Sequence, residues 1–236
     1  MTIITLYDLK RTRRPEDRES WSCNTWKTRI LLNIKGLDYK TNYLHFLEIS
    51  DVITKLDPDC SMPTVPTITD ENGKVIRDSA AIARYIEDQH PEPTVFRGGD
   101  TVHFFFDNWA LKNLADPIYH IILLKMYSEL DDEAQAYFRE SREKWFKMTL
   151  EEYAGDREQH IKTVNDQLTL VAKTLNKNDY MMGDQVGYAD IALASVLIML
   201  EKVEPDVLND CILIHEGNES IASWWKRMQQ YVDGSR

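Results

Sequence analysis

The sequence has few cysteines, and those it has form no recognisable pattern. Its 236 residues contain three, Cys23, Cys60 and Cys211, which are far apart and make no Cys-x-x-Cys motif. An odd number of scattered cysteines is typical of reduced thiols in the cytoplasm and not of a disulfide framework or a zinc site. We therefore expect a cytoplasmic location and no bound metal.

Long apolar runs are also absent. The longest, residues 191–200, is bounded by Asp190 and Glu201 and is well short of the roughly 20 residues that a membrane-spanning helix needs. The first residues lack the basic segment followed by an apolar one that marks a signal peptide. The sequence therefore predicts no membrane partner.

Basic charge is in deficit. The chain has 28 Lys and Arg against 39 Asp and Glu, which gives a formal net charge of −11. Because nucleic-acid binding requires a clustered basic face, this deficit argues against nucleic acid as a partner. A short basic run, residues 10–14, is followed at once by Pro15, Glu16 and Asp17 and is interpreted as a solvated loop.

The N-terminal part of the chain alternates strand-like and helix-like segments. Residues 2–7 are β-branched and apolar, as in a buried strand, and residues 26–36 have helical spacing that ends in a lysine and a glycine. Residues 39–44 alternate again, and residues 66–77 contain an Asn-Gly pair, which is a strong hairpin signal. An amphipathic run over residues 78–90 follows. This order predicts a small mixed sheet with flanking helices.

The C-terminal part has a different periodicity. Residues 91–100 contain prolines and a Gly-Gly pair without periodicity, which indicates a domain boundary. Beyond it, five long segments have helical spacing: residues 102–130, 133–153, 157–175, 188–200 and 221–231. We expect a fold that joins an α/β first domain over residues 1–92, through a linker at 93–100, to an all-helical bundle over 101–236.

Four short motifs occur in order within this frame. They are SCNTWKTR at residues 22–29, TVPTI at 64–68, DSAAI at 78–82, and MGD at 182–184 followed by YADI at 188–191. Together they resemble the cytosolic glutathione transferase family, whose first domain is thioredoxin-like and whose second is all-helical. The first motif is most similar to the fungal etherase-like glutathione transferases and, more distantly, to the zeta-class isomerases.

The sequence departs from the family pattern in three places. Cys23 stands where many relatives have proline, and the charged loop before Ser22 is longer than usual. Gly187 stands where the family usually has Ser or Thr as the cap of a buried helix, with Asp190 three residues later as the second half of a capping box. Such changes can alter activity without altering the fold.

The resemblance implies that Ser22 is the catalytic residue. A free cysteine thiol has a pKa near ~8.5, so glutathione carries little thiolate at neutral pH. Unpaired N–H groups at a helix start and a hydroxyl donor both favour the anion, and lowering the pKa by about two units needs roughly 2.7 kcal/mol. Two alternatives stay open: Ser22 acts only as a helix cap, or Cys23 is a nucleophile that forms a mixed disulfide with glutathione.

The resemblance also implies a binding site for glutathione. Val65-Pro66 is expected to contain a cis peptide bond and to pair its backbone with the cysteinyl unit of glutathione. Ser79 is expected to contact the γ-glutamyl carboxylate at a helix N-terminus, and Asp78 the α-amine. Lys55 is a candidate for binding the glycyl carboxylate.

The electrophile is expected to bind against the start of the helical half. Phe104, Phe105 and Trp109 lie in an aromatic run there, and Tyr119 follows. These residues are candidates to line an apolar pocket, although such a run is also typical of bundle core or a subunit interface.

The function implied is that of a glutathione S-transferase, in which glutathione is co-substrate or cofactor and attacks a small apolar electrophile by conjugation or ether cleavage. One alternative is a glutathione-dependent cis–trans isomerase of a conjugated metabolite. A second is a non-catalytic ligand carrier on the same scaffold. A homodimer is expected.

Overall fold

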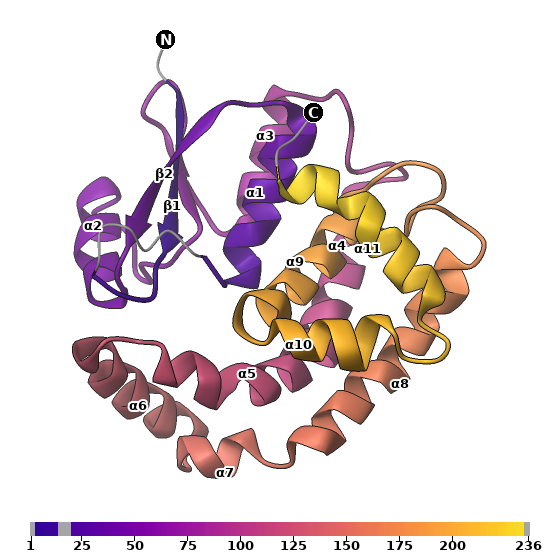
Figure 1. Ribbon diagram of the computed structural model, residues 1–236. Coiled ribbons are helices and arrows are strands. Elements are labelled where there is room, and N and C mark those ends of the chain that lie inside the picture. Colours follow the sequence, from indigo (N-terminus) through magenta and orange to yellow (C-terminus); the bar gives the residue numbers. More distant parts are fainter. Residues whose placement is uncertain (1–2, 14–19, 234–236) are drawn as a thin grey trace.

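The computed structural model describes residues 3–13 and 20–233 (Figure 1). The predicted first strand and the basic run extend to Thr2 and Arg14, which lie outside the described residues. The elements of the first half are β1 (Ile4–Leu9), α1 (Cys23–Lys35), β2 (Tyr39–Leu44), the 3₁₀ turn η1 (Phe46–Glu48), α2 (Ile49–Leu56), β3 (Thr67–Thr69), β4 (Val75–Arg77) and α3 (Ser79–Gln89).

The first half is a thioredoxin-like domain built on a mixed four-stranded sheet, as predicted. The strand order is β2-β1-β3-β4, with β1 parallel to β2 and β3 antiparallel to both β1 and β4. Helices α1 and α3 lie on the side of the sheet that faces the helical half, and α2 lies on the other (Figure 1). In the β3–β4 hairpin, the carboxylate of Asp70 accepts from the N–H groups of Asn72 and Lys74, both at 2.8 Å.

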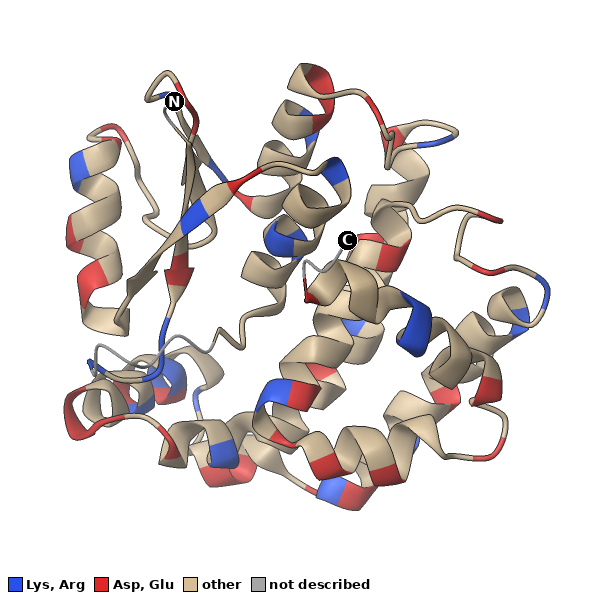
Figure 2. Cartoon of the chain, turned by 45° about the horizontal axis from the view of Figure 1, so that its top comes forward, with Lys and Arg blue, Asp and Glu red and all other residues tan. Residues whose placement is uncertain are grey.

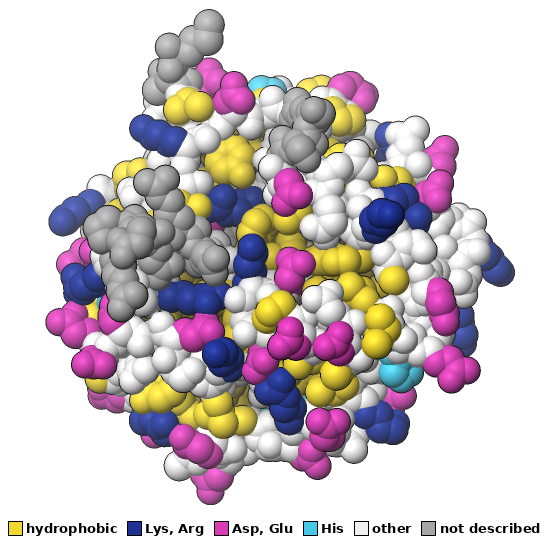
Figure 3. Space-filling model, viewed as in Figure 1, with side chains coloured by type: hydrophobic (Ala, Val, Ile, Leu, Met, Phe, Trp, Pro, Cys, Tyr) yellow, Lys and Arg dark blue, Asp and Glu magenta, His cyan; other side chains and the backbone are white. Residues whose placement is uncertain are grey.

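The second half is all-helical among the residues that the structure describes. Its elements are α4 (Asp100–Ala110), the π-helical turn η2 (Leu111–Ala115), α5 (Asp116–Ser128), α6 (Asp132–Phe146), α7 (Leu150–Ala154), α8 (Arg157–Leu175), α9 (Tyr188–Val203), α10 (Pro205–Val207), the π-helical turn η3 (Leu208–Leu213) and α11 (Glu219–Val232). Acidic and basic residues of both signs are spread over these helices (Figure 2) and intermixed on the face shown in Figure 3.

Two of the predicted helices are divided. The segment 102–130 is interrupted by η2, although the chain keeps its direction. The segment 133–153 breaks at Lys147, which has a φ of 60°, and α7 begins with a capping box between Thr149 and Glu152. The spacing of apolar residues in the sequence does not reveal either break, because one wide or left-handed turn changes few apolar positions.

Helix α9 is the centre of the molecule. It coincides with the most apolar run of the sequence, and all but two of its residues, Glu201 and Lys202, are buried. It packs against α1 from the first half and against α4 and α5 from the second. The two halves therefore share one core. Within residues 3–13 and 20–233, no helix combines the length and apolar character needed to cross a membrane.

Candidate functional site

A cleft of about 590 Å³ lies between the two halves, within the size range of small-molecule sites. One wall comes from the first half and the other from the beginning of the helical half. The lining residues are Asn24 and Lys27 of α1; Met62, Thr64, Val65 and Pro66 before β3; Asp78, Ser79, Ala80 and Arg84 at the start of α3; and Phe104, Asp107, Asn108 and Leu111 of α4 and η2.

Ser22 occupies the N-cap position of α1. Its backbone is extended (φ −68°, ψ 117°), and its carbonyl accepts from Trp26 N–H at 3.0 Å and from the Thr25 hydroxyl at 2.9 Å. Its own side chain makes no capping hydrogen bond. The hydroxyl is thus free to donate. Ser22 itself does not line the cleft, whereas Asn24, two residues later, does.

Cys23 is buried at the first position of α1. Its side chain is 8% exposed, and burial raises the pKa of its thiol above the usual value, with Asp107 acting in the same direction and Lys27 in the opposite one. A buried thiol with a raised pKa forms little thiolate at neutral pH. The structure therefore disfavours Cys23 as the nucleophile.

The Val65–Pro66 peptide bond is cis, as predicted. Both residues line the cleft. The N–H and C=O of Val65 take part in no hydrogen bond with any other described residue, because the β3 ladder begins at Thr67. An extended ligand backbone can pair with these two free groups in the manner of an added strand.

Asp78 and Ser79 begin α3 at the same end of the cleft. The Asp78 carboxylate accepts from the N–H groups of Ala80 and Ala81, both at 3.0 Å, and so occupies much of the helix N-terminus itself. Asp78 has a φ of 74°, and Ser79, which follows it, is 8% exposed. The phenol of Tyr188 is fully buried, its hydroxyl has no hydrogen-bond partner among the described residues, and burial raises its pKa well above the usual value.

Several polar residues of the cleft were not singled out as site candidates by the sequence analysis, among them Lys27, Asp107 and Asn108. Lys27 and Asp107 form an ion pair between α1 and α4, with Nζ 2.6 Å from Oδ1, and their side chains are 1% and 9% exposed. Asn108 follows Asp107 on the same wall. The signal for Lys27 was its place on the apolar stripe of α1, four residues before Leu31. A charge within a buried stripe requires a partner.

The predicted electrophile contacts divide between the cleft and other places. Phe104 lines the cleft and stacks under the Arg84 guanidinium at 4.1 Å. Phe105 is 74% exposed, and Trp109 stacks on Phe106 with ring centroids 5.4 Å apart. On a helix the residues at i, i+3, i+4 and i+7 share a face, so Phe104 aligns with Asp107, Asn108 and Leu111 and not with Phe105 or Trp109.

Tyr119 and Lys55 also lie away from the cleft lining. Tyr119 packs edge-on against Phe146 and Tyr153, each with a centroid distance of 6.4 Å, inside the helical half. Lys55 is exposed on α2. The α4 wall of the cleft is therefore more polar than the aromatic run had indicated.

The glycine at position 187 is explained by its neighbour His103. Asp190 accepts from Gly187 N–H at 3.0 Å, which is one half of the predicted capping box. The other half comes from another helix: Nδ1 of His103 accepts from Ala189 N–H at 3.1 Å, while Nε2 contacts the Arg97 carbonyl at 3.1 Å. Since Nδ1 accepts, Nε2 carries the proton and donates it.

There is no room for a side chain at position 187. A Cβ added there would lie 2.9 Å from His103 Cε1 and 3.3 Å from the Val95 carbonyl oxygen. The histidine thus takes over the role of the missing Ser or Thr hydroxyl, and the departure from the family pattern preserves the cap.

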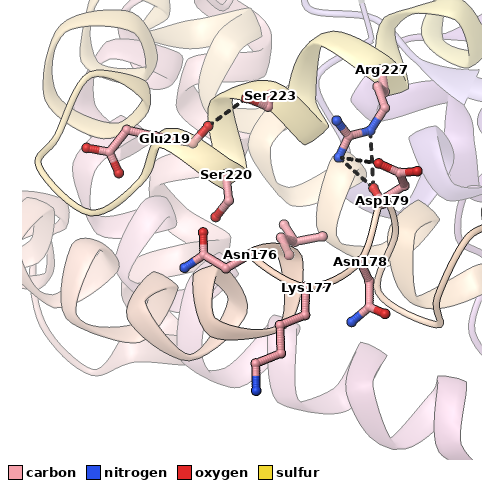
Figure 4. Close-up of a pocket in the computed structure, with 9 residues that line it drawn as sticks. Asn176, Lys177, Asn178, Asp179, Glu219, Ser220, Ser223 and Arg227 are labelled. Carbon is pink, nitrogen blue, oxygen red and sulfur yellow. Dashed lines mark hydrogen bonds and ion pairs between the residues drawn. The ribbon is translucent and has the colours of Figure 1, made fainter.

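A second hollow lies between the end of α8 and the beginning of α11 (Figure 4). Of its two cationic residues, Lys177 and Arg227, the second is already engaged, because Arg227 donates to the Asp179 carbonyl at 2.7 Å. Its serines donate to backbone carbonyls, Ser220 to Ala172 and Ser223 to Glu219. This hollow shares no residue with the cleft.

Family models match both halves of the chain. Residues 21–89 match the glutathione S-transferase N-terminal domain, and residues 101–231 match the glutathione S-transferase C-terminal domain. The glutathione S-transferase-like protein ustS of Aspergillus flavus is 22% identical over 250 residues, which covers 93% of this chain and 88% of that protein. A maleylacetoacetate isomerase of Dictyostelium discoideum is 36% identical over 76 residues, 30% of this chain and 32% of the relative.

Solved structures match nearly the whole chain. The glutathione transferase GSTFuA3 of Phanerochaete chrysosporium has a TM-score of 0.84 and 29% identity, and covers 97% of both chains. The glutathione S-transferase CsGST63524 of Ceriporiopsis subvermispora, solved in complex with glutathione, has a TM-score of 0.83 and 27% identity, over 99% of this chain and 98% of that one.

Proposed function

This chain belongs to the glutathione S-transferase family, and from that premise we propose that it catalyses attack of the glutathione sulfur on a small electrophile held in the cleft between its halves. Glutathione is its co-substrate or cofactor. We retain the division into residues 1–92, 93–100 and 101–236, in which the first domain binds glutathione and the last supplies the electrophile wall.

One observation carries this proposal: the Ser22 side chain begins α1 without capping it. The first N–H groups of a helix have no intrahelical partners and favour a negative charge. A hydroxyl that is not engaged in capping can add a charge-assisted hydrogen bond to a thiolate. Together they supply the roughly 2.7 kcal/mol that a pKa reduction of about two units requires.

The polar groups along the cleft can bind the other parts of the glutathione tripeptide. The free N–H and C=O of Val65 pair with the cysteinyl backbone, which holds the sulfur near the start of α1. Ser79 offers its N–H and hydroxyl to the γ-glutamyl carboxylate. The Asp78 carboxylate, already held by two N–H groups, faces the α-amine, since it would repel a second carboxylate.

The reaction is a displacement. The thiolate forms a carbon–sulfur bond, and the leaving group departs with the electron pair of the bond that breaks. Conjugation and ether cleavage are both reactions of this type. A second copy of the chain completes the assembly: we place the contact at the outer face of α4, where Phe105 and Val102 are 74% and 45% exposed.

A glutathione-dependent isomerisation is the second candidate, and the observation in its favour is the similarity of one segment to maleylacetoacetate isomerase. In that reaction the thiolate adds to a conjugated double bond, the resulting single bond rotates, and the thiolate leaves. Product analysis separates the two candidates, because conjugation consumes glutathione stoichiometrically while isomerisation returns it.

The non-catalytic carrier is the weaker alternative. The reason to consider a carrier was that Cys23 and Gly187 depart from the family pattern. Cys23 is a buried helix residue, and the cap at Gly187 is replaced by His103, so neither departure removes a group that the proposed reaction uses.

The test is the Ser22→Ala variant, with Cys23→Ala as its matched neighbour. With 1-chloro-2,4-dinitrobenzene as electrophile, we expect Ser22→Ala to lower kcat/KM at least tenfold, because a charge-assisted hydrogen bond of about 1.5–3 kcal/mol is lost. The apparent pKa of the bound thiol should rise toward ~8.5. Calorimetric titration with glutathione should still show binding. Unchanged turnover in Ser22→Ala would contradict the proposal, and binding without turnover in the natural chain would favour the carrier.

A further inference from the structure

The phenol of Tyr188 is a buried polar group that the proposed steps leave unused. Tyr188 is the first residue of α9, and its side chain is fully buried. Its ring packs against the rings of Phe96 and Phe104, each with a centroid distance of 5.2 Å. Because Phe104 lines the cleft, Tyr188 lies one side chain behind the wall that the helical half contributes.

The Tyr188 hydroxyl has no hydrogen-bond partner among the residues that the structure describes. Buried hydroxyl groups in proteins are nearly always hydrogen-bonded, because leaving one without a partner is unfavourable. A phenylalanine would fill the same place without that penalty. The exception therefore requires an explanation, and a partner that becomes available when the cleft is occupied provides one.

The groups around the hydroxyl indicate which partner that is. Burial raises the pKa of the phenol, and the carboxylates of Asp107 and Asp78 act in the same direction. The side chains of Ser79 and Arg84 act in the opposite direction. All four residues line the cleft, so the hydroxyl lies close behind the start of α3. Because its pKa is raised, the phenol keeps its proton at neutral pH and is available as a donor.

Ser79 can link the phenol to a ligand. A serine hydroxyl has one proton to donate and two lone pairs that accept. In the function proposed above, that proton is donated to the γ-glutamyl carboxylate, which leaves the Ser79 oxygen able to accept. The Tyr188 phenol is a donor on the protein side of Ser79. Two hydrogen bonds in sequence polarise each other and are stronger together than apart, most of all away from water.

The backbone around Tyr188 holds the phenol in place. The N–H of Tyr188 donates to the Val95 carbonyl at 2.8 Å, and the next N–H, that of Ala189, donates to Nδ1 of His103 at 3.1 Å. The start of α9 is thus fixed by groups from the linker and from α4. A donor on a rigid element loses little conformational entropy when it binds, so it contributes more to affinity than a mobile one.

Resting on the function proposed above, we propose that Tyr188 is a positioning residue of the glutathione site: its phenol donates to the Ser79 oxygen as the Ser79 hydroxyl turns to donate to the γ-glutamyl carboxylate. The phenol keeps its proton, and no covalent bond changes. The helical half, through the first residue of α9, thus contributes to binding the γ-glutamyl end. A peptide without that carboxylate does not complete the chain of hydrogen bonds.

The test measures three affinities by calorimetric titration. The ligands are glutathione, 4-aminobutyryl-cysteinylglycine, which lacks only the α-carboxylate of the γ-glutamyl unit, and glutaryl-cysteinylglycine, which lacks only its α-amine. The variant is Tyr188→Phe, which removes the hydroxyl alone. Its control is Tyr180→Phe, which removes a phenol that interacts with Tyr231 away from the cleft lining.

In Tyr188→Phe we expect the Kd values for glutathione and for the glutaryl peptide to rise about three- to tenfold, which corresponds to the loss of one hydrogen bond. The Kd for the 4-aminobutyryl peptide should stay within about twofold, and the control should leave all three unchanged. In a Ser79→Ala background, Tyr188→Phe should have no further effect, because the linking oxygen is absent. Without ligand, Tyr188→Phe should be at least as stable in urea as the natural chain, since an unpaired hydroxyl is removed.

The inference is wrong if Tyr188→Phe weakens binding of all three ligands equally, or if it leaves the Kd for glutathione within about twofold. A loss of stability without ligand would also overturn it, because the hydroxyl would then have a partner within the protein. These results leave the proposed function in place as long as the natural chain binds glutathione and Ser22→Ala loses turnover. If the natural chain binds no glutathione, the proposed function fails together with the inference.

Discussion

At the scale of single residues, two neighbours at the start of α1 have opposite environments. Ser22 has an unengaged hydroxyl, whereas Cys23 is buried and the pKa of its thiol is raised. The sequence motif predicts that Ser22 and Cys23 both lie at a helix N-terminus, but it does not predict which of the two side chains is buried. That depends on packing against residues far along the chain, such as Asp107 of α4.

The burial of Cys23 gives a direct prediction. In the native protein, Cys23 should react with iodoacetamide more slowly than Cys60, because only the thiolate reacts and burial suppresses it. Cys60 is partly exposed, and its sulfur accepts from the Arg77 guanidinium at 2.8 Å. Mass spectrometry of timed alkylation reports each cysteine separately. Faster labelling of Cys23 would show that its thiol is accessible and would reopen its role as nucleophile.

Residue identities in the cleft were predictable only where a local motif carries them. The cis peptide bond at Pro66 was implied by the family resemblance of the TVPTI motif, and the helix start at Ser79 follows from the Asp78-Ser79 capping pattern. Lys27, Asp107 and Asn108 do not, because their importance arises from contact between helices that are about eighty residues apart in sequence. Phe105 was expected to line the pocket because it belongs to an aromatic run. The composition of the run does not show which of its residues face the cleft, because that is decided by the 3.6-residue repeat of the helix.

At the scale of elements, the beginning of α9 shows how a cap can be supplied from elsewhere. The Gly187→Ser substitution restores the usual family residue, yet we expect it to lower the free energy of unfolding by about 1–3 kcal/mol, because its Cβ would collide with His103. Urea unfolding measures the change.

A double-mutant cycle supplies the control. His103→Ala removes both the obstruction and the cap, so the serine of the double variant can accept from Ala189 N–H. The double variant should be more stable than the sum of the single effects indicates. Strict additivity would mean that His103 and position 187 are not coupled.

The histidine cap is also expected to depend on pH. Burial lowers the pKa of His103 below its usual value, and only the neutral ring accepts at Nδ1. The folded state therefore binds the proton less tightly than the unfolded chain does. Its stabilising contribution is present above about pH 6.5 and is lost as pH falls through the lower pKa of the folded state.

The His103→Gln variant isolates this effect, because an amide can both accept and donate without titrating. The stability difference between the natural chain and His103→Gln should shrink between pH 7.5 and pH 5, measured by urea unfolding. The comparison also cancels Asp190, whose pKa is raised by burial to about 6 in both proteins. A constant difference across this range would contradict the assignment.

At the scale of the whole molecule, the outer face of α4 tests the proposed assembly. Each chain has a mass of 27.6 kDa, and we expect light scattering to show twice that value. Phe105→Glu places a charge at the proposed contact and should shift the protein toward monomers, because burying an unpaired carboxylate is unfavourable. Exposed Trp145, on α6 and also 74% exposed, is the matched control. A dimer that tolerates Phe105→Glu would place the contact elsewhere.

The overall architecture could be predicted from the spacing of apolar residues, because that spacing is regular in both halves of the chain. Alternation gave the strands of a small sheet, and 3.6-residue spacing gave the helices that surround α9. The interruptions at η2 and Lys147 did not follow, since a single wide or left-handed turn changes few apolar positions. The way the halves meet could not be derived from periodicity either, because it depends on which buried faces complement each other.

The π-helical turn η2 contains both a residue that lines the cleft and residues that pack in the core. Leu111 faces the cleft, whereas Leu114 and Ala115 in the same turn belong to the core. A π-helical turn holds one residue more than an α-helical turn, so the faces of α5 are rotated relative to those of α4. Substitutions at the cleft-lining position Leu111 can therefore change the surface offered to a ligand without disturbing the core packing of Leu114 and Ala115.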